Sequence, residues 1–346
     1  MAKISYLNTP FTIKRLSLKN RIVMPPMCQY QAKDGLPNDW HFIHYVSRAV
    51  GGVGLIIVEM TNVAPNGRIS PNCLGLWNDE QRDQFKRIVD AVHAQNGKIA
   101  IQIAHAGRKA LGADDVVSCS PLLYDGVNEA NKQWQYQMPR ELSKDEIADI
   151  IQKFKESTQR AVEAGFDAIE IHGAHGYLIH QFSSPKTNLR TDEYGQDKLL
   201  FGEQVIKAAK SVMPPDMPLI IRFSAQEYGK DGYSIDYGCK IAKRFADAGA
   251  DVLDVSGGGD GQLDPANTPD FHAGYQVYLA SAIRQSIDLP IIAVGMLEDH
   301  YLADYVLSRG DADLIAIGRG LLNDPYWPLR IPSSPFVPAS YQIAFK

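Results

Sequence analysis

Eight short apolar runs, separated by segments with helical periodicity, constrain the fold of this chain more than any other feature. Within each run the apolar residues follow one another without polar alternation. This pattern indicates strands that are covered on both faces, as in a parallel sheet. The expected strands are Ile22–Met24, Leu55–Val58, Ile99–Ile103, Ala168–Ile171, Leu219–Phe223, Val252–Val255, Ile291–Val294 and Leu314–Ile317.

Segments with a 3.6-residue apolar period lie between these runs and predict helices. The clearest follows Ser143 and Glu146, whose spacing is that of a capping box. Gly165, Gly249 and Gly310 each stand just before a strand, where a glycine typically ends a helix. The other expected helices are Glu80–Ala94, Val205–Val212, Tyr237–Ala248, Tyr275–Ser286 and Leu297–Ser308.

This alternation predicts an α/β fold, a single (β/α)8 TIM barrel. A doubly wound sheet is the competing fold, but it would usually show a G-x-G-x-x-G motif after its first strand, where this chain reads Pro25-Pro-Met-Cys28. The segment from Ala104 to Leu142 is too long for a simple connection, so we expect it to cover the barrel mouth.

We expect one domain over residues 1–346, because no break in composition divides the chain. From about residue 326 we expect an irregular, proline-containing tail, since prolines disfavour a regular terminal helix. The prolines concerned are Pro328, Pro332, Pro335 and Pro338.

Charge and cysteine usage narrow the classes of partner. The formal net charge is −5 and no Lys/Arg cluster is present, which argues against nucleic acid and anionic membranes. No apolar run approaches the ~18 residues needed to span a bilayer, and the N-terminus lacks an apolar signal segment. Cys28, Cys73, Cys119 and Cys239 are scattered, as in proteins with reduced thiols. We therefore expect a cytoplasmic protein.

His172, His175 and Tyr177 follow the fourth apolar run and form the most informative cluster. The pair could be structural histidines satisfied by neighbouring backbone groups. It could bind a metal, but a third ligand would be needed, and we expect the side chain of Glu170 to point elsewhere. It could instead donate two N–H groups to one substrate oxygen and stabilise negative charge there, with Tyr177 as general acid. The residues alone leave these three readings open.

Polar groups at other strand ends suggest a flat cofactor. Gln102 and Arg222 interrupt apolar runs, and a buried guanidinium is costly unless it meets an anion, a delocalised acceptor or an ion-pair partner across the barrel. Glycines and an arginine after the seventh and eighth runs are typical of a barrel phosphate site. With a thiol at Cys28, this pattern indicates a flavin mononucleotide (FMN) site. The phosphate residues would be Gly295, Gly318 and Arg319.

Several long motifs, in order, resemble the Old Yellow Enzyme family of FMN-dependent ene-reductases, and most closely its bacterial branch of thermophilic-like enzymes and xenobiotic reductases. The resemblance runs from about Leu7 to Pro325. Its motifs are Asn20-Arg-Ile-Val-Met-Pro-Pro-Met-Cys-Gln-Tyr30, Trp40-His-Phe-Ile-His-Tyr45, Gly67-Arg-Ile-Ser70, Gln102-Ile-Ala-His-Ala-Gly-Arg-Lys109, His172-Gly-Ala-His-Gly-Tyr177, Arg190-Thr-Asp-Glu-Tyr-Gly195 and Ile317-Gly-Arg319.

The resemblance implies a role for each candidate residue. His172 and His175 would bind the carbonyl or nitro oxygen of the substrate, Tyr177 would protonate its α-carbon, and Tyr30 would help close the pocket. Cys28 would tune the flavin potential. The reaction would be ping-pong: NAD(P)H reduces FMN, and an α,β-unsaturated carbonyl or nitro compound then takes the hydride at its β-carbon. The residues implied to contact FMN are Pro25, Pro26, Met27, Cys28, Met60, Gln102, Arg222, Gly295, Gly318 and Arg319.

The chain departs from the family pattern at three places. Met60 stands where relatives usually carry a smaller residue. The stretch after Gly195 is shorter, which puts the start of the next helix in doubt. Ile343 stands where some relatives carry an arginine that reaches a neighbouring subunit, so a homo-oligomer is possible but open.

The alternative functions are a dienoyl-CoA reductase or amine dehydrogenase-like flavin barrel, a metal-dependent hydrolase or lyase using the two histidines, and a flavin-bound redox sensor.

Overall fold

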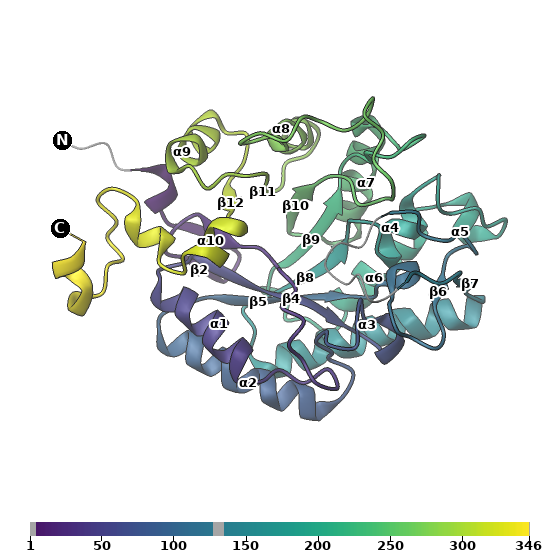
Figure 1. Cartoon of the computed structure of the whole chain (residues 1–346), viewed down its shortest axis with the longest axis horizontal. Coiled ribbons are helices and arrows are strands. Elements are labelled where there is room, and N and C mark those ends of the chain that lie inside the picture. Colours follow the sequence, from purple (N-terminus) through teal and green to yellow (C-terminus); the bar gives the residue numbers. More distant parts are fainter. Residues whose placement is uncertain (1–4, 127–134, 346) are drawn as a thin grey trace.

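The centre of the molecule is a closed barrel of eight parallel strands (Figure 1). The structure, a computed structural model, describes residues 5–126 and 135–345. The predicted TIM barrel is confirmed, and every barrel strand begins at the predicted residue. Around the barrel, the strands are β3 (Ile22–Met24), β4 (Leu55–Asn62), β5 (Ile99–Ala104), β8 (Ala168–Gly173), β9 (Leu219–Ser224), β10 (Val252–Ser256), β11 (Ile291–Ala293) and β12 (Leu314–Ala316).

Helices pack around the barrel and cover the outer faces of its strands (Figure 1). The six predicted helices are all present; their ends lie close to the expected ones, except that the helix expected to begin at Val205 begins at Leu200. They are α2 (Asp79–Ala94), α3 (Lys144–Ala164), α6 (Leu200–Lys210), α7 (Ile235–Ala248), α8 (Val277–Ser286) and α9 (His300–Arg309). The described residues also form four helices that were not predicted: α1 (Asp39–Val50), α4 (Leu178–Ser183), α5 (Glu193–Gln196) and α10 (Arg319–Asn323).

The predicted helix ends are confirmed. The hydroxyl of Ser143 accepts the N–H of Glu146 at 3.3 Å, and the carboxylate of Glu146 accepts the N–H of Ser143 at 2.8 Å. Gly165, Gly249 and Gly310 end α3, α7 and α9 with φ values of 92°, 120° and 77°. Only glycine adopts this left-handed region without strain, which is why these helices stop where they do.

A short hairpin closes the N-terminal end of the barrel. Its strands, β1 (Phe11–Ile13) and β2 (Leu16–Leu18), follow the 3₁₀ helix η1 (Tyr6–Asn8). The hairpin side chains pack into an apolar cluster that fills the barrel interior at that end. The cluster consists of Ile13, Leu16, Leu18, Val23, Leu55, Ile57, Ala100, Ala168, Ile220, Val252, Ile292, Leu314 and Ala316.

The long segment between β5 and α3 covers the opposite end, as predicted. It holds the 3₁₀ helix η3 (Gly107–Lys109) and the strand pair β6 (Val117–Ser118) and β7 (Arg140–Glu141). The side chains of Arg108 and Lys109 donate to the carbonyls of Asp260 and His175, which follow β10 and β8. Residues 127–134 of this segment lie outside the described residues.

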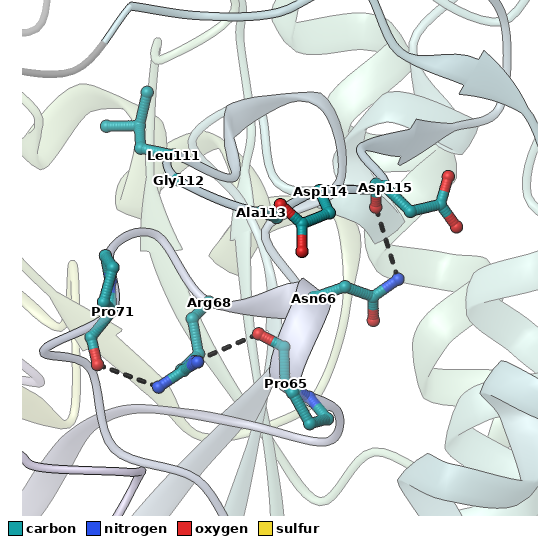
Figure 2. A pocket seen from close by; sticks show the side chains of 9 residues that line it. All are labelled: Pro65, Asn66, Arg68, Pro71, Leu111, Gly112, Ala113, Asp114 and Asp115. Atoms are coloured by element: carbon teal, nitrogen blue, oxygen red, sulfur yellow. Dashed lines mark hydrogen bonds between the residues drawn. The ribbon is translucent and has the colours of Figure 1, made fainter.

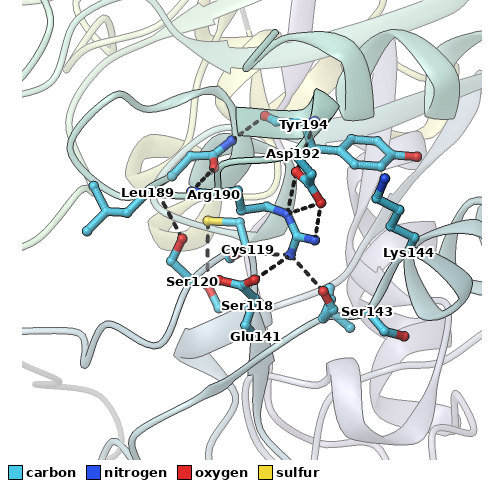
Figure 3. A network of polar contacts seen from close by, with 12 residues as sticks. Ser118, Cys119, Ser120, Glu141, Ser143, Lys144, Leu189, Arg190, Asp192 and Tyr194 are labelled. Carbon is cyan, nitrogen blue, oxygen red and sulfur yellow. Dashed lines mark hydrogen bonds and ion pairs between the residues drawn. The ribbon is translucent and has the colours of Figure 1, made fainter. Parts of the chain in front are cut away.

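Arg190 fastens this segment to the barrel (Figure 3). Its guanidinium donates to the carbonyls of Leu142 at 2.6 Å and Cys119 at 3.3 Å. Asp192 holds the guanidinium from the other side, with 2.6 Å between its Oδ2 and Arg190 Nη2. One buried cation therefore ties together the two flanks of the covering segment.

After α10 the chain continues through two 3₁₀ helices, η4 (Trp327–Arg330) and η5 (Ala339–Ala344). Two short 3₁₀ helices (η2, Pro65–Gly67, and η3) also occur near the barrel mouth. Among residues 5–126 and 135–345, no helix is long and apolar enough to cross a membrane. The single-domain organisation stays a prediction.

Candidate active site

A cavity of about 310 Å³ opens at the C-terminal ends of the barrel strands. It collects eight of the predicted site residues: Pro25, Pro26, Met27, His175, Arg222, Gly295, Gly318 and Arg319. Side chains that sequence reasoning missed complete the wall, among them Ser256, Tyr275, Gln276, Met296 and Glu298.

The loops after β11 and β12 build one end of this cavity and let main-chain atoms approach a ligand closely. Gly295 has φ 127°, and a Cβ there would come within 3.0 Å of the Gln276 nitrogen. At Gly318 a Cβ would make an ordinary contact with the sulfur of Met27, 3.5 Å away. Arg319 adds a guanidinium to the same wall. Close main-chain approach beside an arginine suits a phosphate group.

A polar layer inside the barrel forms the base of the site. Arg222 on β9 stands in register with Asp254 on β10, and 3.4 Å separates Arg222 Nε from Asp254 Oδ2. Gln102 on β5 stands in register with Glu170 on β8 and donates to its Oε1 at 2.8 Å. Arg222 therefore has an ion-pair partner inside the barrel and also lines the cavity.

The expectation that the side chain of Glu170 points away from the histidines is wrong. Side chains alternate along a strand, so residues two apart share a face, and Glu170 and His172 are two apart on β8. Both are buried. Glu170 therefore belongs to the polar layer on the same face of β8 as His172.

Cys28, Tyr30, Met60 and Tyr177 lie together in an apolar cluster that also contains Cys73. The pairing of β4 with β5 shifts register between Val58 and Thr61, the kind of irregularity that re-aims a side chain. Met60 enters the cluster through this shift. The implied neighbours Cys28 and Met60 are thus brought together, although neither lines the 310 Å³ cavity.

Glu59 anchors the loop that carries Cys28 and Tyr30. Its Oε2 accepts the N–H of Gln29 at 2.7 Å, and its Oε1 accepts the hydroxyl of Tyr45 at 3.0 Å. Tyr30 has φ 54°, which is uncommon for a residue other than glycine. The carboxyl group is fully enclosed, and burial raises the pKa of Glu59 to about 8.

The thiols of Cys28 and Cys73 are hydrogen-bonded to each other. This bond, together with burial, raises the pKa of Cys28 well above its usual value. The same bond lowers the pKa of Cys73 to about 7, helped by Ser70, whose N–H donates to the Cys73 sulfur at 3.3 Å. The Cys28 thiol therefore holds its proton more tightly than an ordinary cysteine does.

His172, His175 and Tyr177 are brought together, as the motif predicted. The ring centroids of the two histidines are 5.4 Å apart, and those of His172 and Tyr177 are 4.9 Å apart. His172 Nδ1 accepts the N–H of Ala174 at 3.3 Å, which leaves Nε2 to carry the proton of a neutral ring. His175 Nε2 lies 2.8 Å from the hydroxyl oxygen of Ser256.

Burial keeps this group uncharged. Burial, and next the positive charge of Arg222, lower the pKa of His172 and of His175 well below the usual value. Burial raises the pKa of Tyr177 well above its usual value. Neutral imidazoles can donate N–H groups to a substrate oxygen, and a neutral phenol can donate a proton.

Two further side chains, missed by sequence reasoning, fix the loop that carries the histidines. His180 Nδ1 accepts the N–H of Gly176 at 2.7 Å. Lys109 Nζ donates to the carbonyl of His175 at 2.9 Å and lies 4.8 Å from the ring centroid of Tyr177. Burial lowers the pKa of Lys109 to about 7. Lys109 had a sequence signal, because it ends the Gln102–Lys109 motif, but the motif does not say what the residue contacts.

A second cavity, of about 250 Å³, lies at the barrel mouth and shares Ala113 with the apolar cluster (Figure 2). Arg68 donates to the carbonyls of Pro65 at 3.0 Å and Pro71 at 2.8 Å. Asn66 lies within 3.4 Å of the carbonyl oxygen of Asp115. None of the predicted site residues lines this second cavity.

Comparison with known proteins gives consistent findings. The model of the NADH:flavin oxidoreductase / NADH oxidase family matches residues 6–334. An NADPH dehydrogenase of Clostridium acetobutylicum is 44% identical over 325 residues, which cover 92% of this chain and 92% of that protein. An NADPH dehydrogenase of Bacillus subtilis is 44% identical over 326 residues, covering 93% and 92%.

Solved structures share the fold. Morphinone reductase in complex with tetrahydroNAD superposes with a TM-score of 0.79 at 29% identity, over 94% of this chain and 89% of that one. A 2-naphthoyl-CoA reductase complex superposes with a TM-score of 0.86 over 94% of this chain but only 52% of its own. At 21% identity the second likeness speaks for the fold alone.

Proposed function

The chain belongs to the NADH:flavin oxidoreductase / NADH oxidase family, and from this premise we propose that it is an NAD(P)H-dependent ene-reductase. It is an oxidoreductase of the Old Yellow Enzyme type with FMN as cofactor. The proposal adds the substrate class, activated alkenes conjugated to a carbonyl or nitro group, and the roles of individual residues. Two relatives named NADPH dehydrogenase support NADPH as the reductant.

The residues around the 310 Å³ cavity fit FMN. The Nε–H of Arg222 is buried and makes no hydrogen bond within the described chain, its ion-pair partner Asp254 being 3.4 Å away, so a hydrogen-bond donor in the site is still to be satisfied. Such a donor suits the electron-rich edge of a flavin. Gly295, Gly318 and Arg319 would hold the phosphate. The ring would contact Pro25, Pro26, Met27, Cys28, Met60, Gln102 and Arg222.

The substrate would bind on the side of the histidine pair. FMN, held by the residues named above, would supply hydride-transfer chemistry between NAD(P)H and the β-carbon of the alkene. His172 and His175 donate N–H groups to the substrate oxygen and draw electron density from the double bond. Tyr177 delivers the proton to the α-carbon, so that one hydride and one proton together saturate the bond. Tyr30 closes the pocket.

One observation carries this proposal: the rings of His172, His175 and Tyr177 stand together, all neutral, and His175 lines the same cavity as Arg222. The same three residues would not suit metal binding without a further ligand. Among residues 5–126 and 135–345, no group of three or more His, Cys, Asp or Glu side chains is placed to hold a metal ion.

An anaerobic absorbance titration tests the proposal. The purified protein, with FMN, should bleach on addition of NADPH and regain its flavin spectrum when 2-cyclohexenone is added. A protein that bleaches but is not reoxidised by the enone keeps its cofactor and loses the proposed substrate class. A protein that binds no FMN at all overturns the assignment of the cavity.

A further inference from the structure

Two buried carboxyl groups in the barrel interior, Glu170 and Asp254, have no role in the proposed reaction. They project from β8 and β10, on either side of Arg222 on β9. Both are fully enclosed and lie within hydrogen-bonding reach of each other. The barrel interior toward the N-terminal end is apolar, so no solvent is available to separate their charges.

If both carboxyl groups are ionised, several of their oxygen atoms have no hydrogen-bond donor. Gln102 donates to Glu170 Oε1, but Glu170 Oε2 and both oxygens of Asp254 have no hydrogen-bond partner within the described chain. Buried polar atoms rarely remain unsatisfied. One proton placed between the two carboxyl groups would satisfy an oxygen on each.

The balance of charge also indicates one proton on the two carboxyl groups. Two ionised carboxylates in contact, in a medium of low dielectric, repel each other strongly, and one cation cannot compensate both. Arg222 is the cation nearest to them, 3.4 Å from Asp254 Oδ2. With one proton on the pair, the three groups sum to zero.

We propose that the pair of Glu170 and Asp254 holds a single proton, which resides on Glu170. Asp254 then stays ionised beside Arg222 and limits the positive charge that Arg222 presents to the flavin. The inference rests on the proposed function, since it assumes FMN over Arg222. The two carboxyl groups are positioning residues: they act on the cofactor through Arg222. In support, burial raises the pKa of both carboxyl groups and the charge of Arg222 opposes the rise at each, while the hydrogen bond between the two raises the pKa of Glu170 and lowers that of Asp254.

The number of negative charges on the pair can be tested by measuring the flavin midpoint potential in three variants and comparing it with that of the unmutated protein. Glu170→Gln keeps Asp254 ionised. Asp254→Asn removes the like charge beside Glu170 and lets that carboxyl ionise in its place. Each single variant therefore keeps one negative charge and should change the two-electron reduction equilibrium less than threefold.

The double variant, E170Q with D254N, removes the charge entirely. It should favour reduced flavin about tenfold, which is about 30 mV for a two-electron couple. Asp167→Asn, at the N-terminal end of the barrel, is the matched control and should leave the potential unchanged.

Other patterns overturn the proposal. If Glu170→Gln alone favours reduced flavin about tenfold, both groups are ionised in the native protein. If even the double variant leaves the potential unchanged, the pair carries no charge that the flavin senses. Either result leaves the proposed function standing, because FMN binding and enone turnover are measured separately.

A measurement on the unmutated protein covers the case in which the variants do not fold. Infrared spectra of protein labelled with ¹³C in its glutamate carboxyl groups should show the carbonyl stretch of a protonated glutamic acid. The spectrum is recorded two pH units above the pKa of Glu59, which is about 8, so that Glu59 does not contribute. Absence of the band means that Glu170 carries no proton.

Discussion

At the scale of single residues, the histidine pair is the feature on which the proposed chemistry depends most. Both rings are neutral, and each has one nitrogen engaged by a neighbour, Ala174 for His172 and Ser256 for His175. Replacing both by alanine should lower enone turnover by about 100-fold or more, as loss of preorganised donors does. FMN should remain bound, and phenolic ligands should bind more weakly. Unchanged turnover in this double variant would contradict the assignment.

Cys28 should modulate the flavin rather than react. Its thiol is held neutral by burial and by the hydrogen bond with Cys73. Cys28→Ala should therefore shift the flavin potential and change KM while turnover persists, because Cys28 directly follows Met27, which lines the cavity; Cys73→Ala should change KM less. Potentiometry and steady-state kinetics measure both effects. Complete loss of turnover in Cys28→Ala, with FMN retained, would instead make the thiol a direct participant.

Glu59 should make stability depend on pH. Its folded pKa, about 8, is above the ordinary value of 4.5, so the folded state binds the proton more tightly. The stabilisation is fully present below pH 4.5 and is lost as pH rises toward 8, at about 1.4 kcal/mol per pH unit at most. Glu59→Gln should remove this decline. Chemical denaturation between pH 5 and 9 tests it, with Glu156→Gln on the outer face of α3 as the control.

Individual site residues were predictable where a motif or a strand end marked them. The cluster of His172, His175 and Tyr177 and the glycines after β11 and β12 belong to this group. Cys73 was not predictable as a partner of Cys28, because nothing in the spacing of the two cysteines links them. The misplaced side chain of Glu170 shows that even a simple alternation has to be counted from the correct residue.

At the scale of elements, Arg190 should matter more than any surface ion pair. It is buried, donates to two main-chain carbonyls and pairs with Asp192, so Arg190→Ala leaves those carbonyls unsatisfied. We expect a loss of about 2–4 kcal/mol in the free energy of unfolding, and faster proteolysis between β5 and α3. Arg309→Ala, which breaks an exposed pair with Asp311, is the matched control and should cost less than 1 kcal/mol. Equal effects would remove the anchoring role.

The elements themselves were largely predictable, because buried parallel strands are continuous apolar runs and capped helices carry local signals. Helix α1 was missed for a physical reason. Its sequence is rich in aromatic and histidine residues of weak helix propensity, and Trp40 and Ile43 are exposed, which blurs its apolar stripe. Helix α6 begins at Leu200, before the predicted start, because Phe201 stacks on Phe182 at 4.2 Å, a tertiary contact with no local signal.

At the scale of the whole molecule, buried neutral histidines should make the fold sensitive to acid. Burial lowers the pKa of His41 to about 4 and those of His44 and His105 to about 3, and lowers those of His172 and His175 well below normal. Between pH 6.5 and 4 the unfolded chain takes up protons on these five rings, more than the two that Glu59 and Glu170 lose on unfolding, so stability should fall as pH falls through that window, by several kcal/mol in total. Thermal unfolding from pH 7 to 4 tests this. A constant Tm would contradict the burial of neutral rings.

The hairpin that closes the N-terminal end of the barrel affects how small molecules reach the cavity. With that end filled by apolar side chains, the cavity opens, in the part of the chain that the structure describes, at the C-terminal ends of the strands. In the proposed reaction, NADPH and the alkene would enter through this same opening, and each would block the access of the other. When NADPH is abundant and the alkene is scarce, the nucleotide would occupy the opening most of the time. Release of the nucleotide would then limit turnover as much as binding of the alkene does.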